Sequence, residues 1–378
     1  MFNSAKRIRI SLSLILALLL TLSLALPALA GEAETYGPVA SEDLKVGLIL
    51  IGSKDDGFSG AHYRGMEEMK QHFGLKDEQV LYKFEVNDKD PAATESALRE
   101  LVDVGCQIVF GNSWGYMNTM EELADEYPEV VFSHCSGYKN NGRNFNNYFG
   151  RIYQGRYLSG IAAGLKTQSN KIGYVAAWDE NAEVNGGINA FALGVQSVNP
   201  EAVVYVKYIS SWYDPTLEKQ AAVALLTLDC DVIAQHVDTT MPQIAAEEAG
   251  KFGVGYNADM TVAAPNAHLT APIWNWSVIY IDQVQKILDG KWTAENYYWG
   301  MPEGLIDISP LSGNVAEGTA EKIEEARALI LSGSWDVFTG PLYNNQGEQV
   351  LAEGETLSDA DITSGLMTNL HIQGVEVK

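Results

Sequence analysis

The sequence predicts an α/β protein made of two doubly wound parallel-sheet lobes joined by hinge strands. From Lys45 onward, short apolar runs rich in β-branched residues alternate with longer amphipathic runs, a pattern typical of parallel strands joined by crossover helices. The same pattern starts again after the stretch NYFGRIYQGRYLSGIAAGLK, residues 147–166. The roughly 348 residues beyond an N-terminal leader also exceed the size at which one core usually keeps growing, so we expect two domains.

The first lobe is predicted to alternate four strands with three helices. The residues DPAATE, which start at Asp90, form a typical helix start signal. The predicted strands are 45–52, 80–86, 107–112 and 130–136, and the predicted helices are 60–73, 90–104 and 116–127.

The second lobe repeats this order, and the chain then returns. Its predicted strands are 171–178, 202–210, 231–237 and 252–257, with helices at 185–197, 215–228 and 241–249. A further strand at 267–273, a helix at 276–290 and a charged helix at 316–332 follow. Segments that return after a complete domain usually cross back, so these joints are predicted to be hinges. We therefore expect one lobe from 45–150 plus about 270–300, the other from 151–269 plus about 301–345, and a C-terminal extension at 346–378.

The first thirty residues have the pattern of a secretory signal peptide. A basic start with Lys6, Arg7 and Arg9 precedes an apolar run that ends in the small residues of ALA, 28–30. No cysteine lies near residue 30, so no lipid-attachment site is expected there. The predicted location is periplasmic or extracellular.

Composition narrows the possible partners. A formal charge of −24 argues against nucleic acid and anionic membrane surfaces, because both attract a positive protein surface. The cysteines Cys106, Cys135 and Cys230 lie far apart in apolar runs without CxxC spacing. They are predicted to be buried free thiols.

Candidate binding residues cluster in the loops that follow the predicted strands. In open parallel sheets, ligands bind beyond the carboxyl ends of the strands. Five aromatic residues occupy equivalent loop positions, although only 10% of the chain is aromatic, and three polar residues accompany them: Phe58, Trp114, Trp178, Trp212 and Trp276, with Asp238, Asp259 and Asn275. Aromatic faces with carboxylate acceptors suit a flat heterocycle that offers N–H donors, since stacking contributes about 1–3 kcal/mol per base.

The charge of these loops also disfavours an anionic ligand. Apart from Lys54, Lys139 and Arg143 they lack cations, so phosphate or a free carboxylate would find few partners. A neutral base is the better fit.

Enzyme and metal alternatives find less support. His236 and Asp238 would share one face of a strand, but a metal site needs a third ligand. The sequence has no P-loop, HExxH or GxGxxG motif, and its one match to GxSxG spacing is GNSWG, residues 111–115. His134 beside Cys135 is more typical of a core pair than of a catalytic dyad. An extracytoplasmic α/β hydrolase is the enzyme alternative. We expect no enzyme activity, no metal and no cofactor.

Two tryptophans flank Asn275 at a joint between strand and helix. Alternation on a strand would put Trp274 and Trp276 on the same face. A helix that starts after Ile273, which we favour, would separate them by about 200° around its axis. Trp276 is then predicted to face the ligand and Trp274 to pack inside, while Asn275 offers a donor and an acceptor.

The motifs KVGLILIGSKDDGFSGAHYRG, FGRIYQGRYLSGIAAG, GGINAFALGVQSVNP, SWYDPTLEKQAA, DVIAQHVDTT and FTGP resemble those of the BMP family. This family, also called PnrA-like, comprises substrate-binding proteins of ABC importers. The resemblance spans about residues 45–345. It implies a type I periplasmic-binding fold, a ligand held between two lobes, and delivery to a membrane permease.

Two motifs indicate the branch of the family. The family's nucleoside-binding loop is Asp-x-Gly-Phe-Asn, and here Asp56, Gly57 and Phe58 are kept while Ser59 replaces the asparagine. The late hinge reads APIWNW, without the lysine that holds ribose. The chain is therefore most similar to the branch that binds purine bases.

The resemblance to this branch implies roles for six of the candidate residues. It implies stacking for Phe58, Trp114 and Trp178, and hydrogen bonding for Asp238, Asp259 and Asn275. The expected ligand is adenine, hypoxanthine or guanine, and the protein is expected to be a monomer. A purine nucleoside, or a lobe that reports to a membrane receptor, stays open as an alternative.

Overall fold

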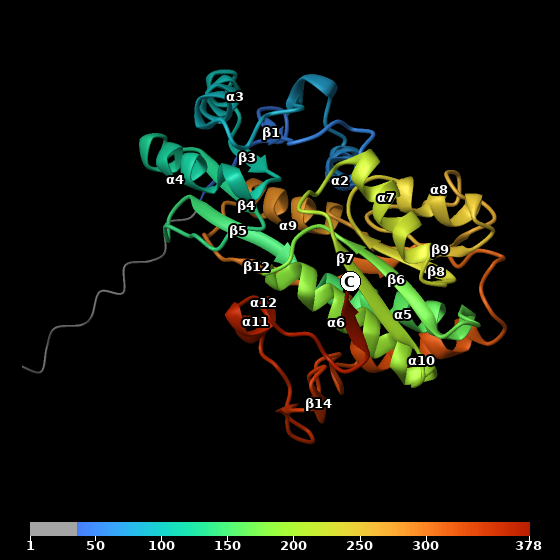
Figure 1. Cartoon of the computed structure of the whole chain (residues 1–378). Coiled ribbons are helices and arrows are strands. Elements are labelled where there is room, and N and C mark those ends of the chain that lie inside the picture. Colours follow the sequence, from blue (N-terminus) through green and yellow to red (C-terminus); the bar gives the residue numbers. More distant parts are fainter. Residues whose placement is uncertain (1–35) are drawn as a thin grey trace, which may run out of the picture. The chain divides into compact units, whose positions relative to one another are not determined.

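Two six-stranded parallel sheets form the framework of this computed structural model, which describes residues 36–378 (Figure 1). The predicted signal peptide lies outside the described residues. In each sheet, every neighbouring pair of strands is parallel. The predicted α/β class with two parallel-sheet lobes is confirmed.

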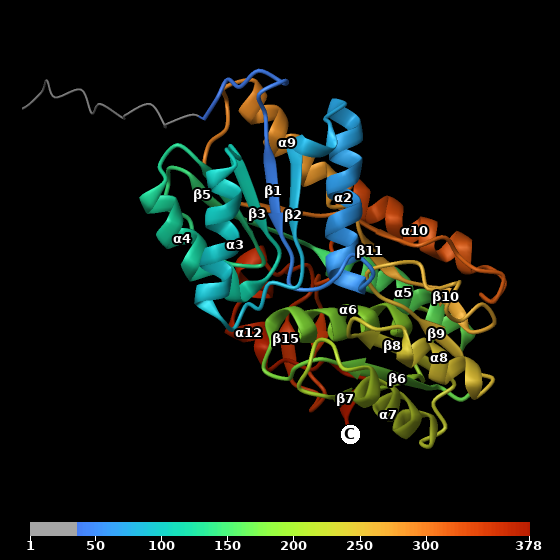
Figure 2. The same ribbon diagram turned by 90° about the horizontal axis from the view of Figure 1, so that it is seen from above.

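The first sheet has the strand order β12-β5-β4-β3-β1-β2. Its strands are β1 (Val46–Ile49), β2 (Val80–Lys83), β3 (Ile108–Gly111), β4 (Val131–Cys135), β5 (Phe145–Gly150) and β12 (Tyr297–Trp299). Figure 2 shows α3 (Pro91–Asp103) and α4 (Met117–Glu126) beside one face, and α2 (Gly57–Phe73) and α9 (Ser277–Leu288) beside the other. Both faces are therefore covered, as the apolar character of the strands predicts.

The second sheet has the order β10-β9-β8-β6-β7-β16. Its strands are β6 (Lys171–Ala176), β7 (Val203–Tyr208), β8 (Val232–His236), β9 (Phe252–Val254), β10 (His268–Thr270) and β16 (Val375–Val377). The helices α5 (Ile152–Lys166) and α6 (Ala182–Val198) cover one face, and α7 (Pro215–Leu226) and α8 (Met241–Glu248) cover the other (Figure 2).

Small residues let α5 and α6 pack with their backbones close together. A Cβ atom added at Gly160 would lie 2.1 Å from the carbonyl oxygen of Phe191, and one added at Gly194 would lie 2.0 Å from that of Tyr157. Neither position has room for a side chain. This explains the glycines in the middle of two otherwise apolar helices.

The chain crosses between the sheets three times. It passes from β5 to α5 at Arg151, from β10 through β11 (Pro272–Trp274) to α9, and from β12 to β13 (Ile306–Ile308). β11 and β13 pair antiparallel with each other. The strand predicted at 267–273 is wrong in this respect, because it is split into β10 and β11, which pair with different partners.

The last residues join the second sheet. After α10 (Thr319–Leu331), the segment forms β14 (Leu342–Tyr343), β15 (Gln349–Leu351), α11 (Asp359–Ile362) and α12 (Gly365–Thr368) before β16 pairs with β7. The side chain of Asn189 on α6 donates to the carbonyl of Leu370 at 2.8 Å. The sequence-based domain boundaries stay a prediction.

Two further findings concern the cysteines and membranes. Cys106, Cys135 and Cys230 are buried and unpaired, as predicted. None of the helices within residues 36–378 has the length and apolar character needed to cross a membrane.

Candidate functional site

The loops that follow β1 and β8, one in each sheet, meet at Gly57. A Cβ atom added at Gly57 would lie 2.8 Å from the backbone oxygen of Asp238 and 3.2 Å from Nδ2 of Asn257. Glycine is therefore needed for this close approach. The contact brings the carboxyl edges of the two sheets together.

Phe58 stands at the first turn of α2, and the turn is fixed by its cap. The carboxylate of Asp56 accepts from the backbone N–H of Ser59 at 2.6 Å and of Gly60 at 3.3 Å. Phe58 is half-buried, and its ring meets that of His62 edge-on at 4.7 Å. Capping thus positions the aromatic ring as well as the helix.

Ser59 ties this turn to the neighbouring strands. Its buried hydroxyl oxygen accepts from the backbone N–H of Gly52 at 3.0 Å and from Nδ2 of Asn112 at 3.2 Å. The Oδ1 atom of Asn112 in turn accepts from the N–H of Ile51 at 2.9 Å. The serine that departs from the family motif therefore has a structural role here.

Trp114 presents an exposed ring beyond β3, on the 3-10 helix η2 (Trp114–Tyr116). The residue is 56% exposed, and its ring lies 5.7 Å from that of Tyr138. The preceding Ser113 donates to Asp88 at 2.7 Å, and the ring of His134 bonds the Ser113 carbonyl at 2.7 Å. The loop is held firmly while the indole stays accessible.

Trp178 and Trp212 lie on loops of the second sheet. Trp178 follows β6 and is 38% exposed. Trp212 is half-buried, with its ring 5.8 Å from that of His236, and its carbonyl accepts from the N–H of Asp238 at 3.0 Å. Trp178 is thus accessible, whereas Trp212 helps to fix the Asp238 loop.

Asp238 lies in an environment that disfavours its charged form. Burial raises the pKa of its carboxyl well above the usual value, and the negative charges of Asp56 and Glu218 raise it further. A hydrogen bond from Nδ2 of Asn257 to Oδ1, at 2.8 Å, lowers it. An N–H donor placed here would relieve the desolvation of the carboxylate.

Glu183, in the first turn of α6, is a second carboxyl in the same region. Burial raises its pKa to about 7, and the charge of Arg156 and a hydrogen bond with Tyr256 act in the other direction. Oε1 lies 3.4 Å from Nε2 of His236, and its negative charge also acts on Asp238. The second lobe therefore offers two acceptor groups.

Behind Glu183 lies a buried arginine. Arg156 is 1% exposed, donates from Nη1 to the carbonyl of Gln235 at 2.6 Å, and stacks 3.8 Å from the ring centre of Tyr256. Within residues 36–378 its Nε and Nη2 have no hydrogen-bond partner. The arginine supplies positive charge without facing solvent.

The two hinge tryptophans are arranged differently from the prediction. Their rings stack on each other at 4.5 Å with an interplanar angle of 11°, so the expected separation of 200° is wrong. β11 runs through Trp274, and α9 begins only at Ser277. The backbone is extended through Trp274 and becomes helical only at Trp276, so the two side chains lie on the same side.

Trp276 is enclosed by protein on both faces of its indole. It is 0% exposed, and the ring of His62 stacks on the face opposite Trp274, at 4.2 Å and 12°. In this structure no face of Trp276 is free to stack on a ligand. It contacts Phe58 edge-on at 6.3 Å, so it supports that ring from within the protein.

Asp259 and Asn275 are exposed and bonded locally. Oδ1 of Asp259 accepts from the backbone N–H of Thr261 at 2.9 Å and from its hydroxyl at 2.6 Å. Oδ1 of Asn275 accepts from Ser277 at 2.5 Å. The structure thus shows Asp238 beside Gly57, whereas no hydrogen bond within residues 36–378 joins the side chain of Asp259 or Asn275 to Asp238.

Sequence reasoning missed Glu183, Arg156, Tyr256 and Asn257. Glu183 stands in AWDENAEVN, and Tyr256 and Asn257 stand in YNADM, two loops that follow predicted strands, so their position was a usable signal. Arg156 lies in the middle of an apolar helix, and only its rarity in such a run could have marked it.

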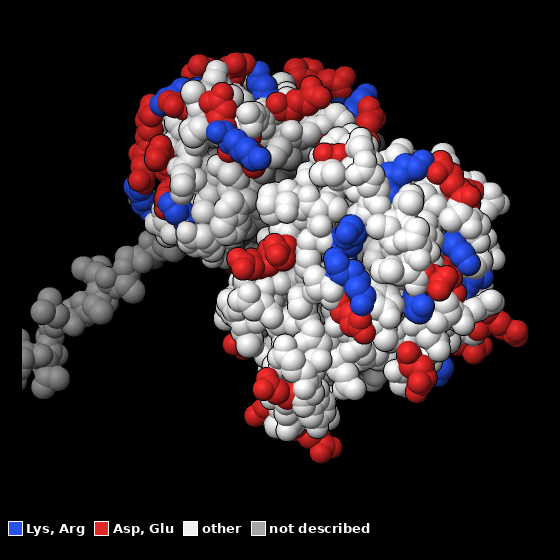
Figure 3. All heavy atoms as spheres, in the orientation of Figure 1, with Lys and Arg blue, Asp and Glu red and all other residues white. Residues whose placement is uncertain are grey.

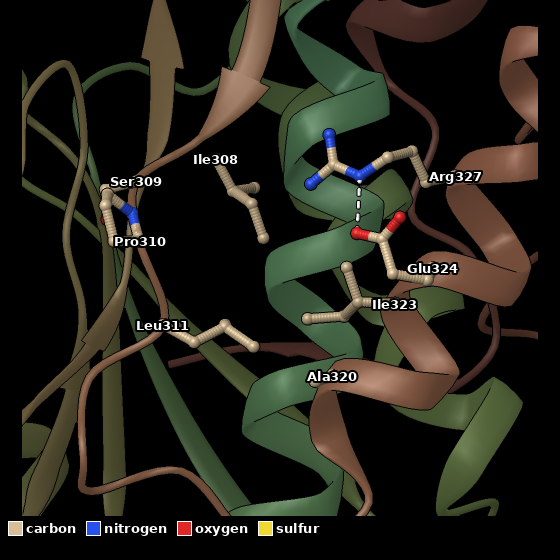
Figure 4. Close-up of a pocket in the computed structure, with 8 residues that line it drawn as sticks. All are labelled: Ile308, Ser309, Pro310, Leu311, Ala320, Ile323, Glu324 and Arg327. Atoms are coloured by element: carbon tan, nitrogen blue, oxygen red, sulfur yellow. Dashed lines mark hydrogen bonds and ion pairs between the residues drawn. The ribbon is translucent and has the colours of Figure 1, made fainter.

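A groove also lies away from these loops. A groove of about 270 Å³ lies between α10 and the segment after β13, with Ile308, Leu311 and Ile323 among its walls (Figure 4). Nε of Arg327 pairs there with Glu324 at 2.9 Å. No predicted site residue lines this groove, so it is separate from the candidate site.

Acidic side chains are unevenly distributed over the surface. On the face drawn in Figure 3, acidic side chains gather over the first-sheet helices at upper left. Within residues 36–378, no three His, Cys, Asp or Glu side chains are grouped to hold a metal ion.

Comparison with known proteins assigns the chain to a family. The family described as "ABC transporter substrate-binding protein PnrA-like", or Bmp, matches residues 44–336. The chain belongs to this family. Members are solute-binding proteins rather than enzymes, and they work outside the cytoplasm.

Two curated relatives of this Bmp protein carry different ligand names. A purine-binding protein of Brucella abortus is 36% identical over 90% of this chain and 95% of its own length. A putative ABC transporter glucose-binding protein of Haloferax volcanii is 33% identical over 85% of this chain and 81% of its own.

Solved structures support the fold of this Bmp protein. A solute-binding protein of an ABC transporter from Conexibacter woesei superposes with a TM-score of 0.65, at 20% identity, over 78% of this chain and 98% of that one. The fold is the type I periplasmic-binding fold implied by the family resemblance.

Proposed function

We propose that this Bmp protein binds a purine base, such as adenine, hypoxanthine or guanine, between its lobes and delivers it to a membrane permease of an ABC importer. The observation that carries the proposal is the 36% identity, over nearly the full length, to a purine-binding protein. The exposed strand-end tryptophans and the acceptor groups support it.

The base stacks on rings from both lobes. Phe58 and Trp114 come from the first-sheet loops and Trp178 from the second, and Trp212 and Trp276 act as supports. Each stacking face contributes about 1–3 kcal/mol. Stacking tolerates any purine, so it supplies affinity but little discrimination among bases.

Hydrogen bonds on the base edge supply the discrimination. Asp238 accepts an N–H of the base and Glu183 offers a second acceptor, while Asn275 and Asp259 join only if closure brings them nearer. A hydrogen bond to an ionised carboxylate contributes about 1.5–3 kcal/mol. Two stacking faces and two such bonds reach the roughly 8 kcal/mol of a micromolar ligand.

Ligand contact with both lobes favours the closed state. A ligand shifts an open-closed equilibrium only by its difference in affinity for the two states. Aromatic rings and hydrogen-bond acceptors from both sheets contact the ligand together only in the closed state, so the ligand binds that state more tightly. In this proposal the protein is secreted through residues 1–30, acts as a monomer in the periplasm or outside the cell, and needs no cofactor.

Isothermal titration calorimetry tests the ligand class. The panel contains adenine, guanine, hypoxanthine, xanthine, their nucleosides, and glucose because of the Haloferax relative. We expect at least one free base to bind with a Kd below about 100 μM, about −5.5 kcal/mol. Binding of glucose alone would contradict the proposal, and tighter binding of nucleosides would shift it to that alternative.

A further inference from the structure

A chain of two hydrogen bonds runs from the hinge to Asp238. The indole N–H of Trp274 donates to Oδ1 of Asn257 at 3.2 Å, and Nδ2 of Asn257 donates to Oδ1 of Asp238 at 2.8 Å. An indole nitrogen can only donate. It therefore requires the amide oxygen of Asn257 on its side and turns the amide nitrogen toward Asp238.

The backbone holds Asn257 in this place. Its φ is +65°, in the left-handed region that few residues other than glycine adopt. Its N–H donates to the carbonyl of Pro272 at 3.0 Å, and it forms an isolated bridge with Ile273 of β11. Asn257 is 1% exposed, so the hinge strand fixes both its backbone and its side chain.

This arrangement leaves one oxygen of Asp238 free. Oδ1 is used by Asn257, and within residues 36–378 no hydrogen bond reaches Oδ2. Gly57 of the first lobe packs against both residues, because its added Cβ would lie within 3.2 Å of Nδ2 of Asn257. The free oxygen therefore lies where the loops of the two sheets meet.

We propose that Asn257, oriented by Trp274, is the positioning residue that aims the free oxygen of Asp238 at an N–H of the ligand. The inference rests on the proposed function for the identity of that ligand. It links the hinge strand to the binding carboxylate, so the tryptophan at the joint acts on recognition without touching the ligand.

The donor also keeps Asp238 ready to accept. Burial and the charges of Asp56, Glu218 and Glu183 raise the pKa of this carboxyl, and the Asn257 hydrogen bond lowers it. Without that donor the pKa rises further, so the carboxylate is protonated at a higher pH. As the pH falls, a ligand that donates an N–H to Asp238 should therefore lose its affinity at a higher pH than it does in wild type.

The test measures purine affinity from pH 5.5 to 8.5 in wild type, Asn257→Leu and Trp274→Phe. Leu keeps the volume but cannot donate, and Phe keeps the ring but lacks the N–H. We expect at least a tenfold loss in Asn257→Leu at pH 7, about 1.4 kcal/mol, and a midpoint of the pH profile that moves upward. Trp274→Phe should move it in the same direction by less.

Trp292→Phe is the matched control. Trp292 is 0% exposed, and its indole donates to Oε1 of Gln283 at 3.1 Å, so it has the same kind of bond away from Asp238. Its pH midpoint should equal that of wild type. The inference would be overturned if the pH profiles of Asn257→Leu and Trp274→Phe had the same midpoint as that of wild type. If Asn257→Leu does not fold, the test compares the pH midpoint of Trp274→Phe, which should be raised, with that of Trp292→Phe, which should not.

A measurement without ligand separates this inference from the proposed function. If no purine binds to wild type, the proposed function is wrong. Urea unfolding from pH 5 to 8 then tests the hydrogen bonds from Trp274 through Asn257 to Asp238 without a ligand. The pKa of Asp238 is higher in the folded than in the unfolded state, so this residue lowers the free energy of unfolding as the pH rises. Trp274→Phe raises this pKa further, so the difference in free energy of unfolding between wild type and the variant should increase with pH. The increase should occur only when Asp238 is present. A gap that behaves identically in the Asp238→Asn background would overturn the inference.

Discussion

Trp178 and Asp238 supply the two kinds of contact that a purine needs, a stacking face and a hydrogen-bond acceptor. We expect Trp178→Ala and Asp238→Ala each to weaken purine binding at least tenfold, because each contact is worth about 1–3 kcal/mol. Calorimetry measures the change. Tyr343→Ala, which removes an aromatic residue 41% exposed on β14, is the control and should bind like wild type. Unchanged affinity in both site variants would mean that the site lies elsewhere.

His134 should make stability depend on pH. Burial lowers its pKa to about 4, whereas the unfolded chain titrates near 6.5. The neutral form is favoured in the fold, so its contribution is present above pH 6.5 and is lost as pH falls toward 4. Between pH 7 and 5 this group alone removes about 2 kcal/mol from the free energy of unfolding.

Comparison of wild type with His134→Gln isolates this effect. The variant is less stable at pH 7, because it loses the packing of the ring, but the difference should narrow by about 2 kcal/mol at pH 5. Urea unfolding gives both values, and His72→Gln, at an exposed site on α2, is the control. A constant difference across this range would refute the assignment of a neutral buried imidazole.

Residue patterns predicted accessibility better than they predicted contacts. Trp114 and Trp178 were predicted to stand at strand ends, and they are exposed there. Trp276 occupies an equivalent place in the sequence, yet His62 and Trp274 cover it. His62 comes from α2, more than 200 positions earlier in the chain, and local sequence does not reveal which distant ring will cover an indole.

At the scale of elements, the cap of α2 should control both stability and binding. Asp56→Ala removes two acceptor contacts at the first turn and should lower stability by about 1 kcal/mol. It should also weaken purine binding severalfold, because Phe58 stands on that turn. Thermal unfolding and calorimetry measure the two effects.

Asp90 provides a matched cap on the same lobe. Its carboxylate accepts from the N–H of Ala92 at 3.1 Å and of Ala93 at 3.2 Å at the start of α3. Asp90→Ala should lower stability by a similar amount and leave affinity unchanged. If both variants bound equally well, α2 would not be part of the site.

Strands and helices were predictable where they are long or repeat a pattern. The helix predicted at 60–73 is observed at Gly57–Phe73, and that predicted at 90–104 at Pro91–Asp103. The run 267–273 is predicted as one strand, although Pro272 lacks an N–H for the ladder and is typical of the first residue of a strand, where the structure has it. Its division at Ala271 depends on two partners, β9 and β13, which belong to different sheets and lie outside any local window.

At the scale of the whole molecule, the periodicity of the sequence was enough for the fold class. Alternating strands and helices imply parallel sheets, and two cycles imply two lobes. The loops at the carboxyl ends of the strands followed from this topology, and the candidate residues were chosen from those loops. The cluster of Glu183, Arg156 and Tyr256 did not follow, because its members come from α6, α5 and the loop after β9 and meet only in the folded chain.

A crystal structure of the protein with its tightest-binding purine tests the central claim most directly. We expect the base between aromatic rings of both lobes, with a ring N–H within about 3 Å of the free oxygen of Asp238. A purine bound outside the loops that follow β1, β3, β6 and β8, or a base whose edge faces no carboxylate, would contradict the claim.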